Sequence, residues 1–424
     1  MEPTFAMATT TDHASLQTAA QITSTAAPNL LLHRLAQVGH SIARVTGAGP
    51  NPLGTHVDEL RGPVESIMEG RPTLMFGTNS YLGLNFHPDC IAASVDAARR
   101  FGTGSTASRV ASGNHLAHQQ LEAQIAALYG RKDAVVFSTG FMANLGVISA
   151  LAREGDAVLL DSHCHASIFD ACKLSGAMIR TFRHNDADDL DAMFAATGVP
   201  ASRTLVIVEG LYSVWGDLAD LPPIVEVTKR HGGLLLVDEA HAMGVYGKHA
   251  RGVAELQGVE DQVDVIVGTF SKSVGVIGGF CVTNNPALKA LRYMARSYLY
   301  TASLPPPVVF AAAAALRLIR DDTSLRERLW RNARHFHGGL QAMGLDLCAQ
   351  AGPIGGVRMR DTRHGLAFWR TLLDNGIYVN IMVPPSTPEG QVILRFSVSA
   401  AHTPEQIETA LGVFRATAGM LAAA

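Results

Sequence analysis

Residues 263 to 282 read VDVIVGTFSKSVGVIGGFCV, two short apolar runs joined by a loop of small residues. The runs, Val263 to Val267 and Gly279 to Val282, have the length and composition of strands that are buried on both faces. Lys272 lies in the loop between them, with no carboxylate beside it in the sequence. Taken alone, such a lysine is more often a snorkelling or ion-paired residue. Its neighbours in the fold must therefore decide its role.

Similar apolar runs recur along the chain, separated by segments long enough for a helix. The further strand candidates are residues 134–137, 157–160, 204–208 and 234–237. The segments between them include helical candidates such as residues 142–152 and 221–230. This alternation predicts an α/β fold with a mainly parallel central sheet flanked by helices. Ligands of such sheets bind outside the carboxyl ends of the strands, so the residues directly after each strand are the candidates for a site.

The two ends of the chain differ from this pattern. Residues 1–28 are rich in Thr, Ala and Ser and predict a mobile tail, and a helical pattern begins near Leu30. Ser303 precedes a run of prolines, which predicts a helix start capped by the serine hydroxyl. Helical sequence then extends to Met343. Short strands at residues 376–380 and 392–397 and a closing helix from Pro404 predict a smaller α+β lobe. We expect three parts: a tail and helical arm at 1–66, a large domain at 67–300 and a small C-terminal domain at 301–424.

Composition excludes several classes of function. The formal net charge of -3 provides no basic field for nucleic acid. Five cysteines without a CxxC pair indicate neither a disulfide framework nor a zinc knuckle, and they favour a reducing cytoplasm. The N-terminus has no basic segment followed by an apolar one, so no secretory signal is predicted. The most apolar helical stretch, residues 308–319, is too short to span a bilayer, although peripheral membrane contact is left open.

Three short motifs imitate known sites without their context. Residues 101–107 contain G-x-G-x-x-A, but a helical pattern at 91–100 stands where a dinucleotide site needs a strand. The acidic run LLLVDEAH at 234–241 lacks the phosphate loop of a nucleoside triphosphatase. His163 and His165 share one face of an extended segment, but no third ligand is evident, so no metal site is predicted.

A phosphate site is indicated at two strand ends. Ser138, Thr139 and Gly140 follow the first central strand and precede a helix, whose N-terminus attracts anions. Thr269 and Ser271 place two more hydroxyl groups after another strand. Either feature alone is weak, because many such turns only cap a helix.

Asp238 and Lys272 follow two strands that one crossover would join, so both should reach one crevice. A carboxylate at the end of a buried strand needs a partner, such as a backbone or His241 donor or a protonated ring nitrogen. A desolvated lysine favours its neutral form, which condenses with an aldehyde. An anion cradle, an acid for a pyridinium nitrogen and an imine-forming lysine together predict a site for pyridoxal 5'-phosphate (PLP).

The motifs of the chain resemble those of the α-oxoamine synthases, a family of fold-type I PLP enzymes, from about Gly62 to Phe414. The matching stretches are Asn79-Ser-Tyr-Leu-Gly83, Ser108-Arg109, Phe137-Ser-Thr-Gly140, His165-Ala-Ser167, Asp238-Glu-Ala-His241 and Gly268-Thr-Phe-Ser-Lys272. More selective are GTFSKSVG at 268–275, YTASLPP at 300–306 and YVNIMVPPSTPEG at 378–390. These three are similar to the branch of the family that uses L-serine and a long-chain acyl thioester.

The resemblance implies a PLP-dependent acyltransferase that acts as a homodimer with composite active sites. It implies condensation of L-serine with palmitoyl coenzyme A, or with another long-chain thioester on coenzyme A or acyl carrier protein. The products would be 3-ketosphinganine, carbon dioxide and the free thiol carrier, in the first step of sphingolipid biosynthesis. Ser108 is small and leaves room for an amino acid side chain, which weakly favours serine over glycine.

The resemblance also assigns roles to residues. Lys272 would bind the cofactor as an imine and act as the base. Asp238 would pair with the ring nitrogen, His241 would contact the ring hydroxyl and His165 would stack on the ring. The other implied cofactor contacts are Gly140, Phe141, Ser213, Thr269, Ser271 and, from the partner subunit, Thr301 and Ala302. The implied substrate contacts are Asn79 or Ser80, Ser108, Arg109, His165 and Arg395.

Some points stay open in the sequence. Another amino acid or acyl donor is an alternative, as is a non-catalytic regulatory paralogue, although a silent subunit need not retain Lys272. The proline-rich loop Pro384 to Pro388 is a candidate lid over the acyl entrance. Trp215 stands where other branches of the family commonly carry an acidic residue, and it indicates only a local change in the pocket wall.

Overall fold

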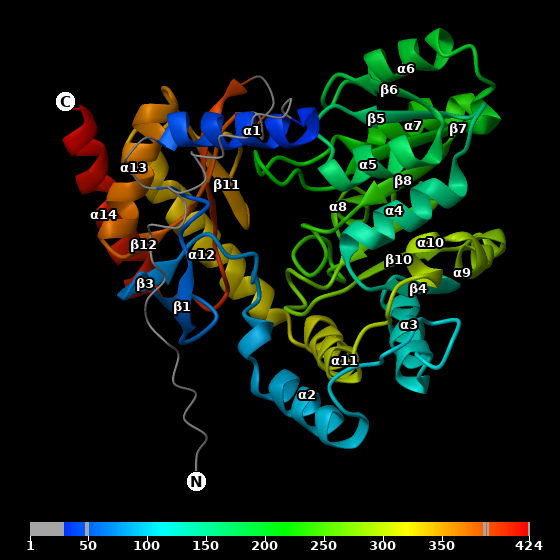
Figure 1. The fold of residues 1–424 in the computed structure, drawn as a ribbon, viewed down its shortest axis with the longest axis horizontal. Coiled ribbons are helices and arrows are strands. Elements are labelled where there is room, and N and C mark those ends of the chain that lie inside the picture. Colours follow the sequence, from blue (N-terminus) through cyan, green and yellow to red (C-terminus); the bar gives the residue numbers. More distant parts are fainter. Residues whose placement is uncertain (1–28, 47–50, 385–386, 388–389, 423–424) are drawn as a thin grey trace. The chain divides into compact units, whose positions relative to one another are not determined.

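The structure, a computed structural model, describes residues 29–46, 51–384, 387 and 390–422 (Figure 1). The chain divides into two units, residues 1–51 and 52–424. In the first unit, α1 (Leu30–Thr46) confirms the helix that was expected near Leu30. The predicted tail at 1–28 and three residues of the proline-rich loop (385, 386 and 388) lie outside the described residues.

A seven-stranded sheet forms the centre of the second unit. Its order is β4 (Asp133–Phe137), β10 (Gly279–Thr283), β9 (Val265–Thr269), β8 (Leu234–Asp238), β7 (Thr204–Glu209), β5 (Ala157–Asp161) and β6 (Met178–Phe182). Only β10 runs antiparallel to its neighbours in this sheet. The predicted mainly parallel sheet is therefore confirmed. The sequence missed β6, because this edge strand is mostly exposed and lacks the apolar run of a buried strand.

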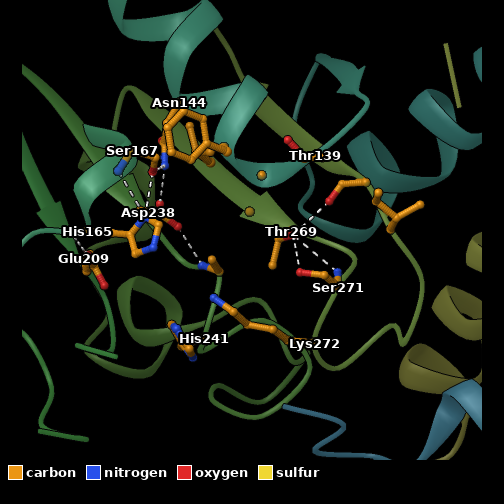
Figure 2. Close-up of a pocket in the computed structure, with 17 residues that line it drawn as sticks. Thr139, Asn144, His165, Ser167, Glu209, Asp238, His241, Thr269, Ser271 and Lys272 are labelled. Carbon is orange, nitrogen blue, oxygen red and sulfur yellow. Dashed lines mark hydrogen bonds between the residues drawn. The ribbon is translucent and has the colours of Figure 1, made fainter. Parts of the chain in front are cut away.

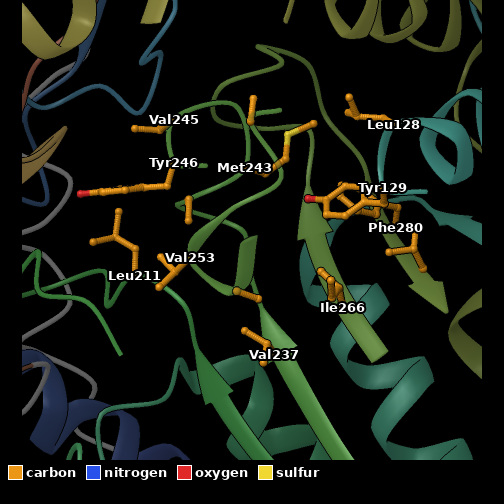
Figure 3. Packing of buried hydrophobic residues seen from close by; sticks show 14 of the residues in the cluster. Leu128, Tyr129, Leu211, Val237, Met243, Val245, Tyr246, Val253, Ile266 and Phe280 are labelled. Atoms are coloured by element: carbon orange, nitrogen blue, oxygen red, sulfur yellow. The ribbon is translucent and has the colours of Figure 1, made fainter. Parts of the chain in front are cut away.

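Side chains of the central strands alternate between two buried layers. Leu235 and Val237 of β8 face a cluster that includes residues of α3 (Leu116–Leu128) and α7 (Leu221–His231) (Figure 3). Leu236 faces the opposite cluster, to which α4 (Gly140–Leu151) and α5 (Ala166–Ser175) contribute. Helices thus cover both faces of the sheet. Polar side chains that end these strands are consequently left at the edge formed by their carboxyl ends.

A second core lies between two smaller sheets and three helices. The sheets join segments far apart in the chain, as the blue and orange strands of Figure 1 show for β3 and β12. The four-stranded sheet contains β1 (Val57–Leu60), β2 (Glu65–Met68), β3 (Arg71–Met75) and β12 (Ile377–Tyr378). The three-stranded sheet contains β11 (Ile354–Met359), β14 (Val392–Ser397) and β13 (Asn380–Met382). The helices are α12 (Thr323–Ala342), α13 (Thr362–Asp374) and α14 (Pro404–Ala422). Phe336, Trp369 and Phe396 fill this core.

Three features differ from, or add to, the sequence expectations. The helical stretch to Met343 is two helices, α11 (Pro306–Asp321) and α12, because the Asp322 side chain accepts a hydrogen bond from the Ser324 amide and starts a new helix. The predicted cap by Ser303 is wrong, since its hydroxyl donates to the Gly113 carbonyl. The shorter helices are α2 (Pro88–Phe101), α6 (Ala187–Ala196), α8 (Val253–Leu256), α9 (Leu291–Met294) and α10 (Arg296–Leu299).

The predicted domain boundaries stay a prediction. Strand β3, from the range expected for the large domain, pairs with β12 from the range expected for the small one. Helix α11 packs on α2 and α3, across the expected boundary at residue 300. Among the described residues, none of the helices combines the length and apolar character needed to cross a bilayer.

Candidate active site

Two adjoining cavities lie where the central strands end. The smaller, of about 290 Å³, is lined from the ends of β7, β8 and β9 and from the start of α4 (Figure 2). The larger, of about 720 Å³, adds residues of the second core region, among them Arg395. Both cavities are lined by His165, His241 and Lys272. The side chains that the strand pattern singled out thus meet at one place.

Lys272 stands three residues beyond β9, beside the parallel strand β8. The register pairs Asp238 with Val267, which brings the two predicted groups to the same level of the sheet. Burial lowers the pKa of the Lys272 amine to about 8; Asp238 and Glu209 oppose this effect, and the Arg395 cation adds to it. Among the described residues, the amine makes no salt bridge. A substantial neutral fraction is therefore available near neutral pH.

Asp238 is fixed by hydrogen bonds to both of its carboxylate oxygens. Oδ1 accepts from the Ala240 amide at 2.8 Å, and Oδ2 accepts from Asn144 Nδ2, also at 2.8 Å. Asn144 donates in addition to the Ser167 hydroxyl at 3.0 Å. Both Asn144 and Ser167 line the smaller cavity, and sequence reasoning missed them. The available signal was the spacing of Asn144, four residues after Gly140 and so on the same face of α4.

The start of α4 forms an anion cradle. Thr139 caps the helix, its hydroxyl accepting from the Met142 amide at 3.0 Å. Thr269 Oγ1 lies 2.9 Å from Ser271 Oγ beside this helix end. A Cβ added at Gly140 would stand 2.9 Å from the Thr269 Cβ, so only glycine allows the close approach of helix and strand. Free helix amides, the helix dipole and two hydroxyls suit a phosphate group.

His165 and Glu209 line the cavity on the side of β7. The His165 amide donates to the Glu209 carboxylate, and His165 Nδ1 lies 2.8 Å from the Ser167 hydroxyl. Glu209 ends β7 directly beside Asp238 at the end of β8. Burial, and next the Asp238 charge, raise the pKa of Glu209 well above its usual value. Sequence reasoning missed Glu209, although a carboxylate closing an apolar strand was the signal that identified Asp238.

His241 faces the same space as a neutral ring. Its Nδ1 lies 2.7 Å from the Tyr81 hydroxyl, which is also 3.2 Å from Asn79 Oδ1. Burial lowers the pKa of His241 well below its usual value, and the Lys272 and Arg395 cations add to this effect. Tyr81 is another partner that sequence reasoning missed. It lies within the matched stretch 79–83, but no local pattern connects it to His241.

Arg395 brings a cation from β14 into the larger cavity. Its Nη2 donates to Asn79 Oδ1 at 3.0 Å, and its Nε donates to the Ser213 carbonyl at 2.6 Å. Asn79 and Ser213 line this cavity as well. The sequence left open whether Asn79 or Ser80 serves the substrate. The structure brings Asn79 to Arg395, whereas the Ser80 hydroxyl donates to Asn85 Oδ1 at 2.5 Å.

Several predicted residues lie apart from Lys272. Arg109 is buried and forms a salt bridge with Glu122 at 2.9 Å. It lines a small hollow together with Thr301 and Ala302, and Lys272 is not part of that hollow. Ser108 lines none of these three spaces. The roles of Thr301 and Ala302 across a subunit interface and those of Ser108 and Arg109 toward substrate stay predictions.

Trp215 has a structural explanation that the sequence did not supply. Its buried ring stacks on His163, with centroids 5.7 Å apart, and the Arg358 guanidinium carbon lies 5.5 Å from its ring centroid. His163 stacks in turn on His184, so it belongs to an aromatic stack. Among the residues described, no group of three His, Cys, Asp or Glu side chains is placed to hold a metal.

Comparisons with known proteins agree with this geometry. Residues 71–414 match the family model described as aminotransferase class I and II. A serine palmitoyltransferase of Caulobacter vibrioides is 47% identical over 87% of this chain and 92% of its own length. An 8-amino-7-oxononanoate synthase of Pseudomonas putida is 40% identical over 81% of this chain and 88% of its own. A solved serine palmitoyltransferase variant from S. paucimobilis, with a bound adduct of PLP and myriocin, superposes with a TM-score of 0.90. It is 43% identical, and the match covers 93% of this chain and 100% of the other.

Proposed function

Because the chain belongs to the aminotransferase class I and II family, and within it to the α-oxoamine synthases, we propose that it is a PLP-dependent serine palmitoyltransferase. The reaction joins L-serine to palmitoyl coenzyme A and yields 3-ketosphinganine, carbon dioxide and coenzyme A. The observation that carries the proposal is the meeting of Lys272, Asp238 and the α4 anion cradle in one cavity. The fold and family expected from the sequence are confirmed.

The residues at the strand ends fit four parts of PLP: its phosphate, its ring nitrogen, its ring face and its ring hydroxyl. The start of α4 with Thr269 and Ser271 would hold the phosphate. Asp238, whose oxygens already accept from Asn144 and Ala240, would keep the ring nitrogen protonated. When bound, PLP supplies an electron-withdrawing ring that stabilises negative charge at the Cα of an amino acid. His165 would lie against the ring, and His241, with Ser213, would contact its hydroxyl.

The chain's own groups divide the chemical work. The Lys272 amine, with its pKa lowered to about 8, is a base suited to take the Cα proton near neutral pH. Arg395 would bind the serine carboxylate through its guanidinium, with Asn79 holding that guanidinium in place. The serine carbanion then attacks the thioester carbonyl, and the thiol leaves. Loss of carbon dioxide from the resulting β-keto acid completes the product.

The larger cavity is suited to the second substrate. Its lining combines polar groups near Lys272 with Phe169, Val214 and Met382, which can contact an acyl chain. Thr387, from the proline-rich loop, also lines it. The lid role of that loop stays a prediction, since three of its residues lie outside the described part.

Other expectations stay predictions about the whole protein. These are the homodimer with composite sites, the cytoplasmic location, the place in sphingolipid biosynthesis and the absence of nucleic acid partners. Peripheral membrane contact also stays a prediction. Helix α1 is the element suited to it, because residues 30–46 contain apolar side chains, two arginines and two histidines but no acidic residue.

Replacing Lys272 tests the proposal directly. Lys272→Ala should abolish formation of 3-ketosphinganine from L-serine and palmitoyl coenzyme A, because no other amine lines the cavity beside Asp238. Mass spectrometry of the product measures this. Lys248→Ala, which changes an exposed lysine, is the matched control and should keep wild-type turnover. Turnover that persists in Lys272→Ala would contradict the assignment of the catalytic lysine.

The alternative functions are separated by the same wild-type assay. Carbon dioxide release across pairs of amino acids and acyl thioesters distinguishes serine with a long acyl chain from glycine with a short one. Efficient turnover of another pair, with little from serine, would move the protein to another branch of the α-oxoamine synthases. No turnover with any pair would favour the non-catalytic paralogue.

A further inference from the structure

Behind the wall of the larger cavity, three side chains form a partly buried bridge. His184 Nδ1 donates to Asp161 at 2.9 Å, and its Nε2 donates to Asp217 at 2.6 Å. Asp161 is fully buried, and His184 is 20% exposed. A histidine ring that donates from both nitrogens to carboxylates carries a positive charge. The bridge is therefore a charged and largely enclosed connection between two loops.

The first loop connects the bridge to His165. Asp161 is the last residue of β5, and its Oδ1 also accepts from the His163 amide at 2.8 Å. The His163 ring stacks on the His184 ring with centroids 3.9 Å apart, and His163 also lines the larger cavity. His165 follows two residues later. The conformation of residues 162–166 thus depends on what Asp161 and His184 bind.

The second loop connects the bridge to Arg395. Residues 212–217 form a tight turn that two backbone hydrogen bonds close. The Tyr212 amide donates to the Asp217 carbonyl at 2.9 Å, and the Gly216 amide donates to the Tyr212 carbonyl at 3.0 Å. The Ser213 carbonyl in this turn accepts from Arg395 Nε. Trp215, from the same turn, closes the stack on His163. Displacement of the turn would therefore rotate the guanidinium that faces the cavity.

Asn185 strengthens the connection next to His184. Its backbone has a φ of 54°, a left-handed conformation that asparagine tolerates better than most residues. The backbone amide of Asn185 donates to Asp161 Oδ2 at 2.9 Å, and the side-chain Nδ2 of Asn185 donates to the Leu218 carbonyl at 3.0 Å. His184 thus contacts Asp161 and Asp217, and Asn185 contacts Asp161 and Leu218. Together the two residues connect both loops.

We infer that His184 is a positioning residue that clamps loops 162–166 and 212–217 together and thereby orients His165 and Arg395 for the amino acid substrate. The inference rests on the proposed function, in which Arg395 binds the serine carboxylate. The clamped loops carry His165 and the Ser213 carbonyl that holds Arg395, whereas Phe169 and Met382 lie outside both loops. The clamp therefore serves amino acid binding more than acyl binding. Trp215 and His163 complete it by filling the space between the loops.

The decisive variant is His184→Phe, which keeps an aromatic ring in the stack and removes both hydrogen bonds. The matched control is His231→Phe. His231 also bonds an aspartate, Asp191 at 2.5 Å, and stacks on a ring, Phe194 at 4.5 Å, but it lines neither cavity. Hydrogen–deuterium exchange of the cofactor-free proteins should become faster at 162–166 and 212–217 in His184→Phe alone.

Kinetics of the PLP-loaded proteins provide the second readout. We expect the KM for L-serine to rise by about tenfold or more in His184→Phe, because a small misplacement of binding groups is costly. The KM for the acyl donor should change much less, because only Val214 among its proposed contacts lies in a clamped loop. Unchanged exchange in the two loops, or faster exchange with a wild-type KM for serine, would overturn the inference. A wild-type protein without serine turnover would instead contradict the proposed function, and the exchange result would still test the clamp.

A second pair of variants covers the case in which His184→Phe does not fold. Asp217→Asn keeps an oxygen that accepts from His184, whereas Asp217→Ala removes it. The alanine variant should show the loss of serine affinity and the faster exchange, and the asparagine variant should largely restore both. Equal behaviour of the two variants would overturn the inference.

Discussion

Glu209 and Asp238 are neighbouring carboxylates with different hydrogen-bond partners. They end adjacent strands at the same level, and both are almost fully buried. Asp238 accepts hydrogen bonds from the Asn144 side chain and the Ala240 backbone amide, both at 2.8 Å. The pKa of Glu209 is raised well above its usual value by burial and then by Asp238. The Asp238 charge thus disfavours a second negative charge on Glu209.

The lowered pKa of Lys272 makes its reaction with the cofactor depend on pH. Only the neutral amine attacks an aldehyde, so covalent attachment of PLP to the cofactor-free protein should accelerate about tenfold per pH unit below about 8 and level off above it. Rapid mixing, borohydride trapping and mass spectrometry of the Lys272 peptide measure the rate. Arg395→Met should move the midpoint upward, because the Arg395 cation helps to lower this pKa. A rate independent of pH from about 6 to 9 would contradict the prediction.

At the scale of elements, the sequence predicted strands better than it predicted contacts. Strands β7 and β8 were recognisable because they are buried on both faces and therefore apolar throughout. Lys272 and Asp238 were recognisable because they end or follow such strands. Asn144 was not, since its partner Asp238 is brought to α4 only by packing of the helix on the sheet. The break at Asp322 was missed because capping there depends on one local hydrogen bond.

Helix α4 and strand β9 must approach closely to build the phosphate cradle. Gly140→Ala places a Cβ 2.9 Å from the Thr269 Cβ, an atom next to the backbone that cannot move freely. We expect weaker PLP binding by about tenfold or more, because helix and strand must separate and the hydroxyls move from the phosphate. Titration of the cofactor-free protein with PLP, followed by absorbance, measures this.

Gly338→Ala is the control at the same scale. Gly338 lies inside α12 with nothing within 4 Å of an added Cβ. The Gly338→Ala variant should keep the PLP affinity of the wild type. Its free energy of unfolding should rise by about 0.5–1 kcal/mol, as expected when alanine replaces glycine in a helix. Equal PLP affinity in Gly140→Ala and Gly338→Ala would show that the close approach at Gly140 does not shape the site.

At the scale of the whole second unit, the site depends on pairing that sequence reasoning could not place. Lys272 and Asp238 come from the seven-stranded sheet, whereas Arg395 comes from the three-stranded sheet of the second core. Asn79, which holds Arg395, follows β3, and β3 pairs with β12 from the far end of the chain. Such long-range contacts leave no periodic signal in the sequence. The resemblance to known motifs supplied Arg395, and only the structure connects it to Ser213 and the clamp.

The clamp also makes the stability of the protein depend on pH. Burial alone would lower the pKa of His184, but hydrogen bonds to Asp161 and Asp217 raise it to about 9 from an ordinary 6.5. Its folded-state pKa is raised, so its contribution to the free energy of unfolding is fully present below pH 6.5 and is lost as the pH rises through about 9. Discounted for partial exposure, that contribution is about 2 kcal/mol.

Comparison of wild type with His184→Phe isolates this contribution from the other titrating groups. The difference between their free energies of unfolding, from denaturant titrations, should be largest near pH 6 and should shrink by about 2 kcal/mol toward pH 9.5. His231→Phe should show little change in its difference over the same range, because an exposed ion pair contributes little. A His184→Phe difference that stays constant with pH would mean that folding does not raise the pKa of His184. The charge on His184 would then add nothing to the stability of the folded protein.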